Sequence, residues 1–141
     1  MTKDIEHFVN GSPTAAKNDR FADVFNPATG EATKRVALAS KAEVRAAVEA
    51  AKAALPGWSA TPPAKRAQVM FKFRDLIIKN HDALAEAVSK EHGKTFDDAK
   101  GEVARGLEVV EFVCGIPHVL KGEYSDNVAG GVDSVGIRQP V

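Results

Sequence analysis

The stretch EHGKTFDDAKGEVARGLEVVEF, residues 91–112, decides how this chain of 141 residues folds. It predicts the end of one helix, a tight turn at Gly93, and a second helix that starts charged and becomes almost wholly apolar. Thr95 is the expected N-cap of the second helix, and Asp98 follows three residues later. One arginine, Arg105, stands where the character changes from charged to apolar. Arg105 is therefore the candidate substrate contact.

The second helix carries two adjacent apolar stripes and should end near residues 115–117. The first stripe consists of Ala99, Val103, Gly106, Val110 and Val113, and the second of Val109, Phe112 and Ile116. Because a helix that is apolar on more than one side has to be covered on more than one side, we expect this helix to be buried on both stripes.

Two interpretations of Arg105 stay open at this point. Glu102 and Glu108 lie three residues away on either side, which is the spacing of an intrahelical salt bridge. Alternatively, the guanidinium projects beside Val109 and Phe112 into a cleft and binds a carboxylate through two parallel hydrogen bonds. Periodicity alone favours the salt bridge.

Three more helices are expected before residue 92. Ser40 and Glu43 form a capping box that starts the first helix, and residues 56–57 (Pro-Gly) should end it. The second helix begins with Thr61 as the cap and Pro62 at its first position, and a short third helix runs from about residue 82 to residue 91. The side chains expected to be buried are Val44, Ala47, Val48, Ala51 and Leu55, then Val69, Met70, Phe73, Leu76 and Ile77, then Leu84, Ala87 and Val88.

The ends of the chain are expected to form short antiparallel strands. Near the N-terminus, strands at 8–9, 21–25 and 33–38 flank turn signals at Asn10-Gly11 and at residues 26–30, although a loosely ordered arm is the alternative. A loop containing Gly130-Gly131 should follow Tyr124. Residues 132–141 then alternate, with Val135, Ile137, Gln139 and Val141 on one side, and Pro140 suits an edge strand.

Composition limits the possible partners. The 19 basic and 19 acidic side chains cancel, so neither nucleic acid nor an anionic membrane is an expected partner. A single cysteine, an N-terminus without a signal peptide's apolar run and the lack of a membrane-length apolar segment point to a cytoplasmic, soluble setting. The four histidines (His7, His81, His92 and His118) lack the spacing of a metal site.

Other chemistry-bearing motifs are weak. Gly93-Lys94-Thr95 imitates the end of a phosphate-binding P-loop, but Val88 stands where that motif needs glycine, and a helix rather than a strand precedes it. The sequence contains no G-x-G-x-x-G fingerprint. Cys114 lies in an apolar segment that keeps it a thiol, so it is expected to be structural. No catalytic, cofactor-binding or metal-ligating residue is therefore assigned.

Taken together, these features resemble the N-terminal part of an aldehyde dehydrogenase superfamily subunit. The matching pieces are residues 26–31 (NPATGE), the helix 42–58, Arg66, and residues 91–95 (EHGKT) with Glu102 after them. The resemblance covers essentially the whole chain and implies an α/β fold for the intact family, of which this fragment is mainly α-helical with short antiparallel strands at both ends. It divides the chain into 1–131, strands and helices that precede or flank the NAD-binding domain, and 132–141, the start of an oligomerisation or sheet-pairing strand. We expect the chain to be truncated after residue 141.

Within that superfamily, residues 102–112 resemble the CoA-acylating methylmalonate-semialdehyde dehydrogenases. The resemblance implies that the parent protein oxidises methylmalonate or malonate semialdehyde, with NAD and CoA, to propionyl-CoA or acetyl-CoA with loss of carbon dioxide. It also implies that Arg105 lines the substrate tunnel and holds the carboxylate of the semialdehyde. The catalytic cysteine, the general base and the NAD contacts of the family have no matching positions here, so the fragment alone is expected to be inactive. A homo-oligomer, dimer or tetramer, is expected.

Two alternatives remain at this stage. The parent protein could be another member of the aldehyde dehydrogenase superfamily. The chain could instead be a stand-alone helical interaction module, whose apolar stripes between residues 99 and 116 form the interface.

Overall fold

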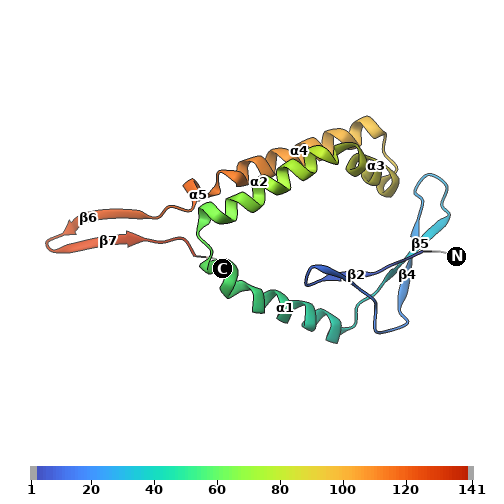
Figure 1. The fold of residues 1–141 in the computed structure, drawn as a ribbon, viewed down its shortest axis with the longest axis horizontal. Coiled ribbons are helices and arrows are strands. Elements are labelled where there is room, and N and C mark those ends of the chain that lie inside the picture. The colour runs from blue at the N-terminus through green and yellow to red at the C-terminus, as the bar shows by residue number, and fades with distance from the viewer. Residues whose placement is uncertain (1–2, 140–141) are drawn as a thin grey trace. The chain divides into compact units, whose positions relative to one another are not determined.

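The computed structural model describes residues 3–139, which divide into two compact units. The first unit comprises residues 1–60 and 81–103, and the second comprises residues 61–80 and 104–141. Each unit combines helices with short strands, and one helix, α4 (Phe96–Cys114), begins in the first unit and ends in the second (Figure 1). The expected mainly helical chain with short strands at both ends is confirmed.

The first unit starts with two small sheets. Strands β1 (Lys3–Ile5), β5 (Ala32–Ala37) and β4 (Phe21–Phe25) pair in that order, and β2 (His7–Val9) forms a separate hairpin with β3 (Ser12–Thr14). Asn10 and Gly11 both have positive φ, 53° and 79°, as the predicted tight turn requires. The antiparallel β4–β5 pair and the turn after β2 were predicted, but no strand was expected at β3. The parallel β1–β5 pair was not predicted, because no turn joins these two strands.

Helix α1 (Lys41–Ala60) begins with the predicted capping box. The Glu43 carboxylate accepts the backbone N–H of Ser40 at 2.7 Å, and the Ser40 hydroxyl accepts that of Glu43 at 3.3 Å. Glu43 also accepts the backbone N–H of Lys17 at 2.7 Å, and these bonds, that of Lys17 first, lower the pKa of Glu43 to about 2. The box therefore ties the helix start to the segment that precedes β4.

Two predictions for α1 were wrong. The helix continues past Pro56 to Ala60, since a proline this near the C-terminal end disturbs only the last turns. The predicted buried stripe is also largely uncovered, with Val44 52%, Val48 57% and Leu55 50% exposed. Amphipathic spacing identified the apolar side of the helix correctly, but the β2–β3 hairpin faces it only across a groove, so its large side chains stay exposed.

Helix α3 (His81–His92) matches the predicted short helix, and Gly93 ends it with φ +81°. The N–H of Gly93 donates to the carbonyl of Ser89 at 2.8 Å, which closes the helix. Its covered residue is Ala85, which is fully buried, whereas the predicted inward residue Leu84 is 40% exposed. Ala87 is exposed as well, and Val88 is half-buried.

Helix α4 starts and ends where it was predicted, but only one of its two stripes is covered. Ala99 is fully buried and Val110 is 9% exposed, whereas Val109 and Phe112 of the second stripe are 63% and 66% exposed. The expectation that α4 is buried on both stripes is therefore wrong for the described residues, because Val109 and Phe112 stay exposed, although Ile116 at the end of the second stripe is half-buried. After Gly115 the chain makes the short helix α5 (Ile116–Val119).

Helix α2 (Pro63–Lys79) begins one residue later than predicted. Pro62, not Thr61, occupies its N-cap, and Pro63 takes the first helical position, where the missing N–H costs nothing. Ala67 is its one buried residue. Of the predicted inward residues, Met70 and Ile77 are half-buried, whereas Val69, Phe73 and Leu76 are exposed.

The chain ends in an antiparallel hairpin, β6 (Glu123–Ala129) with β7 (Val132–Gly136). The loop predicted after Tyr124 is therefore a strand up to the turn at Gly130-Gly131. The predicted strand 132–141 is too long, because β7 ends at Gly136 and residues 137–139 are not strand, and residues 140–141 lie outside the described residues. The pairing register shifts around Asn127, where φ is +49°, and Asp133 holds this irregularity. Its carboxylate accepts the Asn127 N–H at 2.9 Å and the Tyr124 hydroxyl at 2.7 Å.

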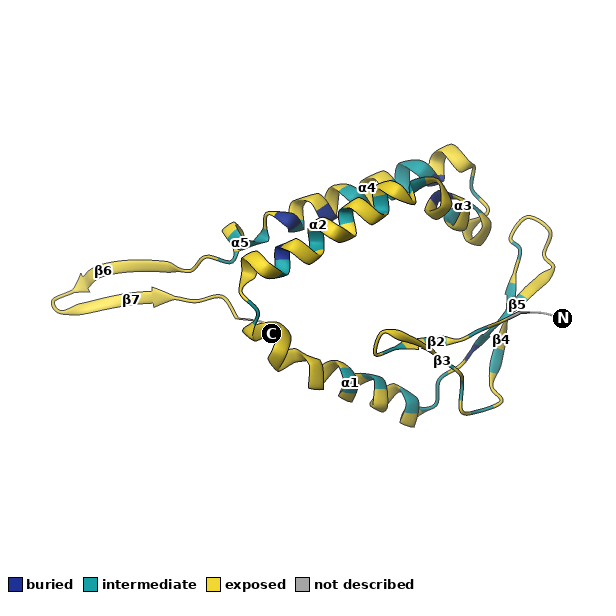
Figure 2. Ribbon diagram, in the orientation of Figure 1, coloured by how far each residue is buried: buried dark blue, intermediate teal, exposed yellow. Residues whose placement is uncertain are grey.

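Small side chains make up the buried core of the described residues. Figure 2 marks the few buried positions in dark blue along the ribbon. The buried residues are Ala37, Ala67, Ala85, Ala99, Val110 and Cys114. Most large apolar side chains are exposed instead. Among the described residues, no helix is both long and apolar enough to cross a membrane.

We predict that Gly93→Ala destabilises the chain by about 1 kcal/mol or more, because an L side chain is strained at positive φ. The added Cβ would also lie 3.0 Å from Cγ of Pro27. Gly57→Ala is the matched control, since its Cβ meets open space. Urea unfolding should give a lower midpoint for the Gly93 variant only, and equal midpoints for the two variants would contradict the prediction.

We predict that Tyr124, the single tyrosine of the chain, titrates above its usual range, because the bond to Asp133 holds the phenol protonated and raises its pKa. The stabilisation is present at neutral pH and is lost as the pH rises through the folded-state pKa. Phenolate absorbance followed against pH measures this directly. Asp133→Asn should bring the pKa back toward its usual value, and an unchanged titration would contradict the assignment.

Candidate functional site

Arg105 lies on the exposed side of α4, with Val109 four residues and Phe112 seven residues further along the same face. Both apolar neighbours are more than half exposed. In the other direction, the same face continues through Glu102 to Asp98. We call these five residues the α4 stripe: two carboxylates, one guanidinium and two apolar side chains in order along the helix.

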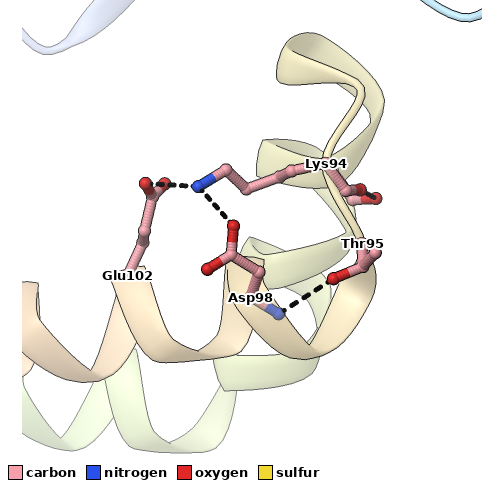
Figure 3. A network of polar contacts seen from close by, with 5 residues as sticks. Lys94, Thr95, Asp98 and Glu102 are labelled. Atoms are coloured by element: carbon pink, nitrogen blue, oxygen red, sulfur yellow. Dashed lines mark hydrogen bonds and ion pairs between the residues drawn. The ribbon is translucent and has the colours of Figure 1, made fainter.

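Lys94 neutralises the acidic end of the α4 stripe. Its ammonium lies 2.9 Å from Oδ2 of Asp98 and 2.5 Å from Oε1 of Glu102 (Figure 3). The Lys94 side chain is only 13% exposed, whereas those of Asp98 and Glu102 are 59% and 40% exposed. The hydrogen bonds to Glu102 and then Asp98 raise the pKa of Lys94 above its usual range, so the ammonium is charged throughout the physiological range.

The turn before α4 fixes the position of Lys94. The backbone carbonyl of Lys94 accepts a hydrogen bond from the Ser89 hydroxyl at 2.7 Å, which connects Lys94 to the last turn of α3. The Thr95 hydroxyl accepts the backbone N–H of Asp98 at 3.4 Å, which is the predicted N-cap. Figure 3 shows Lys94 reaching from this turn forward along α4 to both carboxylates.

A second ion pair joins α2 to the C-terminal part of α4. The Nε atom of Arg74 donates to Oε1 of Glu111 at 2.9 Å, and Nη1 of Arg74 lies 3.2 Å from Oδ1 of Asp75. Sequence reasoning missed both Arg74 and Lys94. Lys94 and Asp98 are four residues apart, so a search for charge pairs at helical spacing would have found them, but no such signal links Arg74 to Glu111.

The Gly93-Lys94-Thr95 turn does not form a phosphate site. The ammonium of Lys94 in Gly93-Lys94-Thr95 is held by two carboxylates, which would repel a pyrophosphate, so the rejection of a P-loop here has a structural reason. Within residues 3–139, no group of three His, Cys, Asp or Glu side chains is placed to hold a metal ion. Cys114 is buried, as expected of a structural cysteine.

An apolar groove lies elsewhere in the first unit, between the β2–β3 hairpin and α1. It has a volume of about 800 Å³, and its walls include Phe8, Val44 and Val48. Arg105 does not line it. The α4 stripe is therefore the candidate site, because there a cation adjoins apolar surface and can pair with an organic anion.

The sequence matches the aldehyde dehydrogenase family over residues 14–141. Over 137 residues it is 48% identical to malonate-semialdehyde dehydrogenase of Pseudomonas aeruginosa, covering 97% of this chain and 27% of the relative. It is 45% identical to the mitochondrial, acylating methylmalonate-semialdehyde dehydrogenase of Arabidopsis thaliana, covering 100% of this chain and 23% of the relative. The chain thus spans about a quarter of the length of these relatives.

A solved structure shares the fold throughout. A protein of Sinorhizobium meliloti 1021, assigned as a methylmalonate-semialdehyde dehydrogenase and complexed with NAD, superposes with a TM-score of 0.95 at 52% identity. The superposition covers 100% of this chain and 29% of that protein. Family match, sequence relatives and fold agree over nearly every residue, and the chain belongs to the aldehyde dehydrogenase family.

Proposed function

We propose that this chain is the N-terminal part of a dehydrogenase subunit that oxidises malonate or methylmalonate semialdehyde, and that Arg105 binds the carboxylate of that substrate. The observation that carries the proposal is the position of Arg105 on the exposed face of α4 beside Val109 and Phe112. Relatives of 48% and 45% identity that act on these semialdehydes support it.

The chemistry of the substrate fits this face. A semialdehyde of this class carries a permanent carboxylate, which is costly to remove from water unless a charged donor meets it. A guanidinium offers two parallel N–H groups that match both carboxylate oxygens, so it orients the substrate as well as binding it. The adjoining side chains of Val109 and Phe112 suit the short carbon chain.

The proposed reaction takes NAD as the oxidant and CoA as the acyl acceptor. The aldehyde carbon would lose a hydride to NAD, the acyl group would pass to the CoA sulfur as the thiol gives up its proton, and the carboxylate carbon would leave as carbon dioxide. None of these steps is assigned to a residue of this chain. In the Gly93 turn before α4, the Lys94 ammonium is already paired with the carboxylates of Asp98 and Glu102. The complete subunit is placed in the cytoplasm, where a buried thiol such as Cys114 stays reduced.

The β6–β7 hairpin is proposed to pair with a second subunit, which would make the enzyme a dimer or tetramer. Every residue of both strands is exposed, and one face carries the paired residues Tyr124 and Val135, which are 63% and 67% exposed. An apolar two-stranded ribbon is only marginally stable alone, and its open edges favour pairing with another strand.

The two alternatives receive less support. A stand-alone interaction module would not need similarity to long enzymes over the whole chain, as found here with 97% and 100% coverage. Other aldehyde dehydrogenases share the fold at lower identity, for example 28% for an NAD-dependent benzaldehyde dehydrogenase of Corynebacterium glutamicum. The substrate class therefore rests on the semialdehyde-specific relatives and on Arg105.

Arg105→Leu in the complete subunit should raise the KM for malonate semialdehyde about 10- to 100-fold, because one charge-assisted contact is lost. The KM for propanal, which has no carboxylate, should change far less. Both are measured by following NADH formation, with Arg45→Leu on the exposed side of α1 as the matched control. Equal losses with both aldehydes would favour the salt-bridge interpretation of Arg105.

Val135→Lys should weaken subunit assembly, since a charge on the apolar face of the hairpin opposes strand pairing. Sedimentation of the complete subunit should show smaller species at concentrations at which the unmodified enzyme stays assembled. Ser134→Lys, on the opposite face of β7, is the control. Assembly that is insensitive to Val135→Lys would place the subunit interface elsewhere.

A further inference from the structure

We infer that Lys94 is a positioning residue that sets the selectivity of this enzyme for carboxylated aldehydes, by neutralising the two carboxylates that share the α4 stripe with Arg105. The inference rests on the proposed function of Arg105 and adds a second residue to it. Lys94 need not touch the substrate in this scheme, because it acts through Asp98 and Glu102.

The spacing along α4 brings these charges together. Asp98, Glu102 and Arg105 lie at intervals of four and three residues, so successive side chains are neighbours on one helix face, with Cβ atoms about 5–6 Å apart. Glu102 therefore adjoins Arg105 on one side and the Lys94 ammonium on the other. A carboxylate in this position is drawn to both cations.

The charge balance depends on Lys94. With Lys94 present, two cations (Lys94 and Arg105) balance two carboxylates (Asp98 and Glu102), and the Lys94 ammonium is fixed at 2.9 Å from Asp98 and 2.5 Å from Glu102. Without Lys94, the Glu102 carboxylate next to Arg105 would lose its ammonium partner, and the charge along the α4 stripe would become more negative. Glu102 would then compete with the carboxylate of the substrate for the guanidinium, and both Glu102 and Asp98 would repel the substrate as it approaches.

The environment of Lys94 makes it an effective neutralising group. Its side chain is 13% exposed, so water screens its ion pairs less than it screens the surface pair between Lys90 and Glu86, whose side chains are 71% and 60% exposed. The bond from Ser89 to the Lys94 carbonyl and the cap at Thr95 hold the turn in place. Lys94 is therefore held in a fixed position at the start of α4.

The test compares malonate semialdehyde with propanal in the complete subunit, as the ratio of the two kcat/KM values. Lys94→Met should lower this ratio about two- to fivefold, the size expected when a partly exposed charge pair is lost. Adding Glu102→Gln to Lys94→Met should restore most of the ratio, because the competing carboxylate is gone. Lys90→Met is the matched control and should leave the ratio unchanged.

The double variant separates this role from a structural one, since a general loss of folding would lower both kcat/KM values and would not be rescued by Glu102→Gln. If Lys94→Met is insoluble, Glu102→Gln alone decides: the ratio should rise about twofold, and a ratio that is unchanged or lower would overturn the inference. An unmodified enzyme without preference for malonate semialdehyde would overturn the proposed function and this inference with it. A clear preference in the unmodified enzyme that Lys94→Met leaves intact would overturn the inference alone.

Discussion

The start of α4 depends on the ion pairs that the Lys94 ammonium makes with Asp98 and Glu102. Gly93 reverses the chain at positive φ, and the next residue then reaches forward to Asp98 and Glu102, one and two turns into the helix. Carboxylates near a helix N-terminus are already favoured by the helix dipole, so the lysine adds a second, directional reason for α4 to begin at Phe96. The register of Arg105 follows from this start, because each later residue of the helix is fixed in rotation by the first turn.

A second constraint is the shortage of covering elements. The buried core consists of small side chains, and most large apolar side chains on α1, α2 and α4 stay exposed. A helical stripe reports which side of a helix is apolar, but burial also needs another surface at the right place. The relatives are about four times as long as this chain, as their coverage of 27% and 23% shows. In relatives of that length, additional chain is available to lie over such stripes.

Local signals in the sequence were sufficient to predict most of the fold. The capping box at Ser40, the Asn10-Gly11 turn, the stop at Gly93 and the cap at Thr95 all depend on residues within a few positions of one another, and each is found in the structure. Features that depend on distant residues were missed. The parallel pairing of Asp4 with Arg35 could not be predicted, because no turn motif in the sequence joins the two strands. The bulge held by Asp133 looked like a loop, because Asn127 interrupts the alternation of apolar and polar residues that is typical of a strand.

The candidate site shows the same division between local features that were predicted and distant ones that were missed. The helical periodicity placed Arg105 at a polar-to-apolar boundary but favoured an intrahelical salt bridge. Only the resemblance to a family indicated that Arg105 binds a substrate. The structure contributes the contact of Lys94 with Glu102, the carboxylate that the salt-bridge interpretation assigned to Arg105. A carboxylate shared with a nearly buried ammonium pulls less strongly on a neighbouring guanidinium. If Arg105 binds the substrate as proposed, the salt bridge and the substrate contact compete within one charge network, and Lys94 would shift the balance toward the substrate.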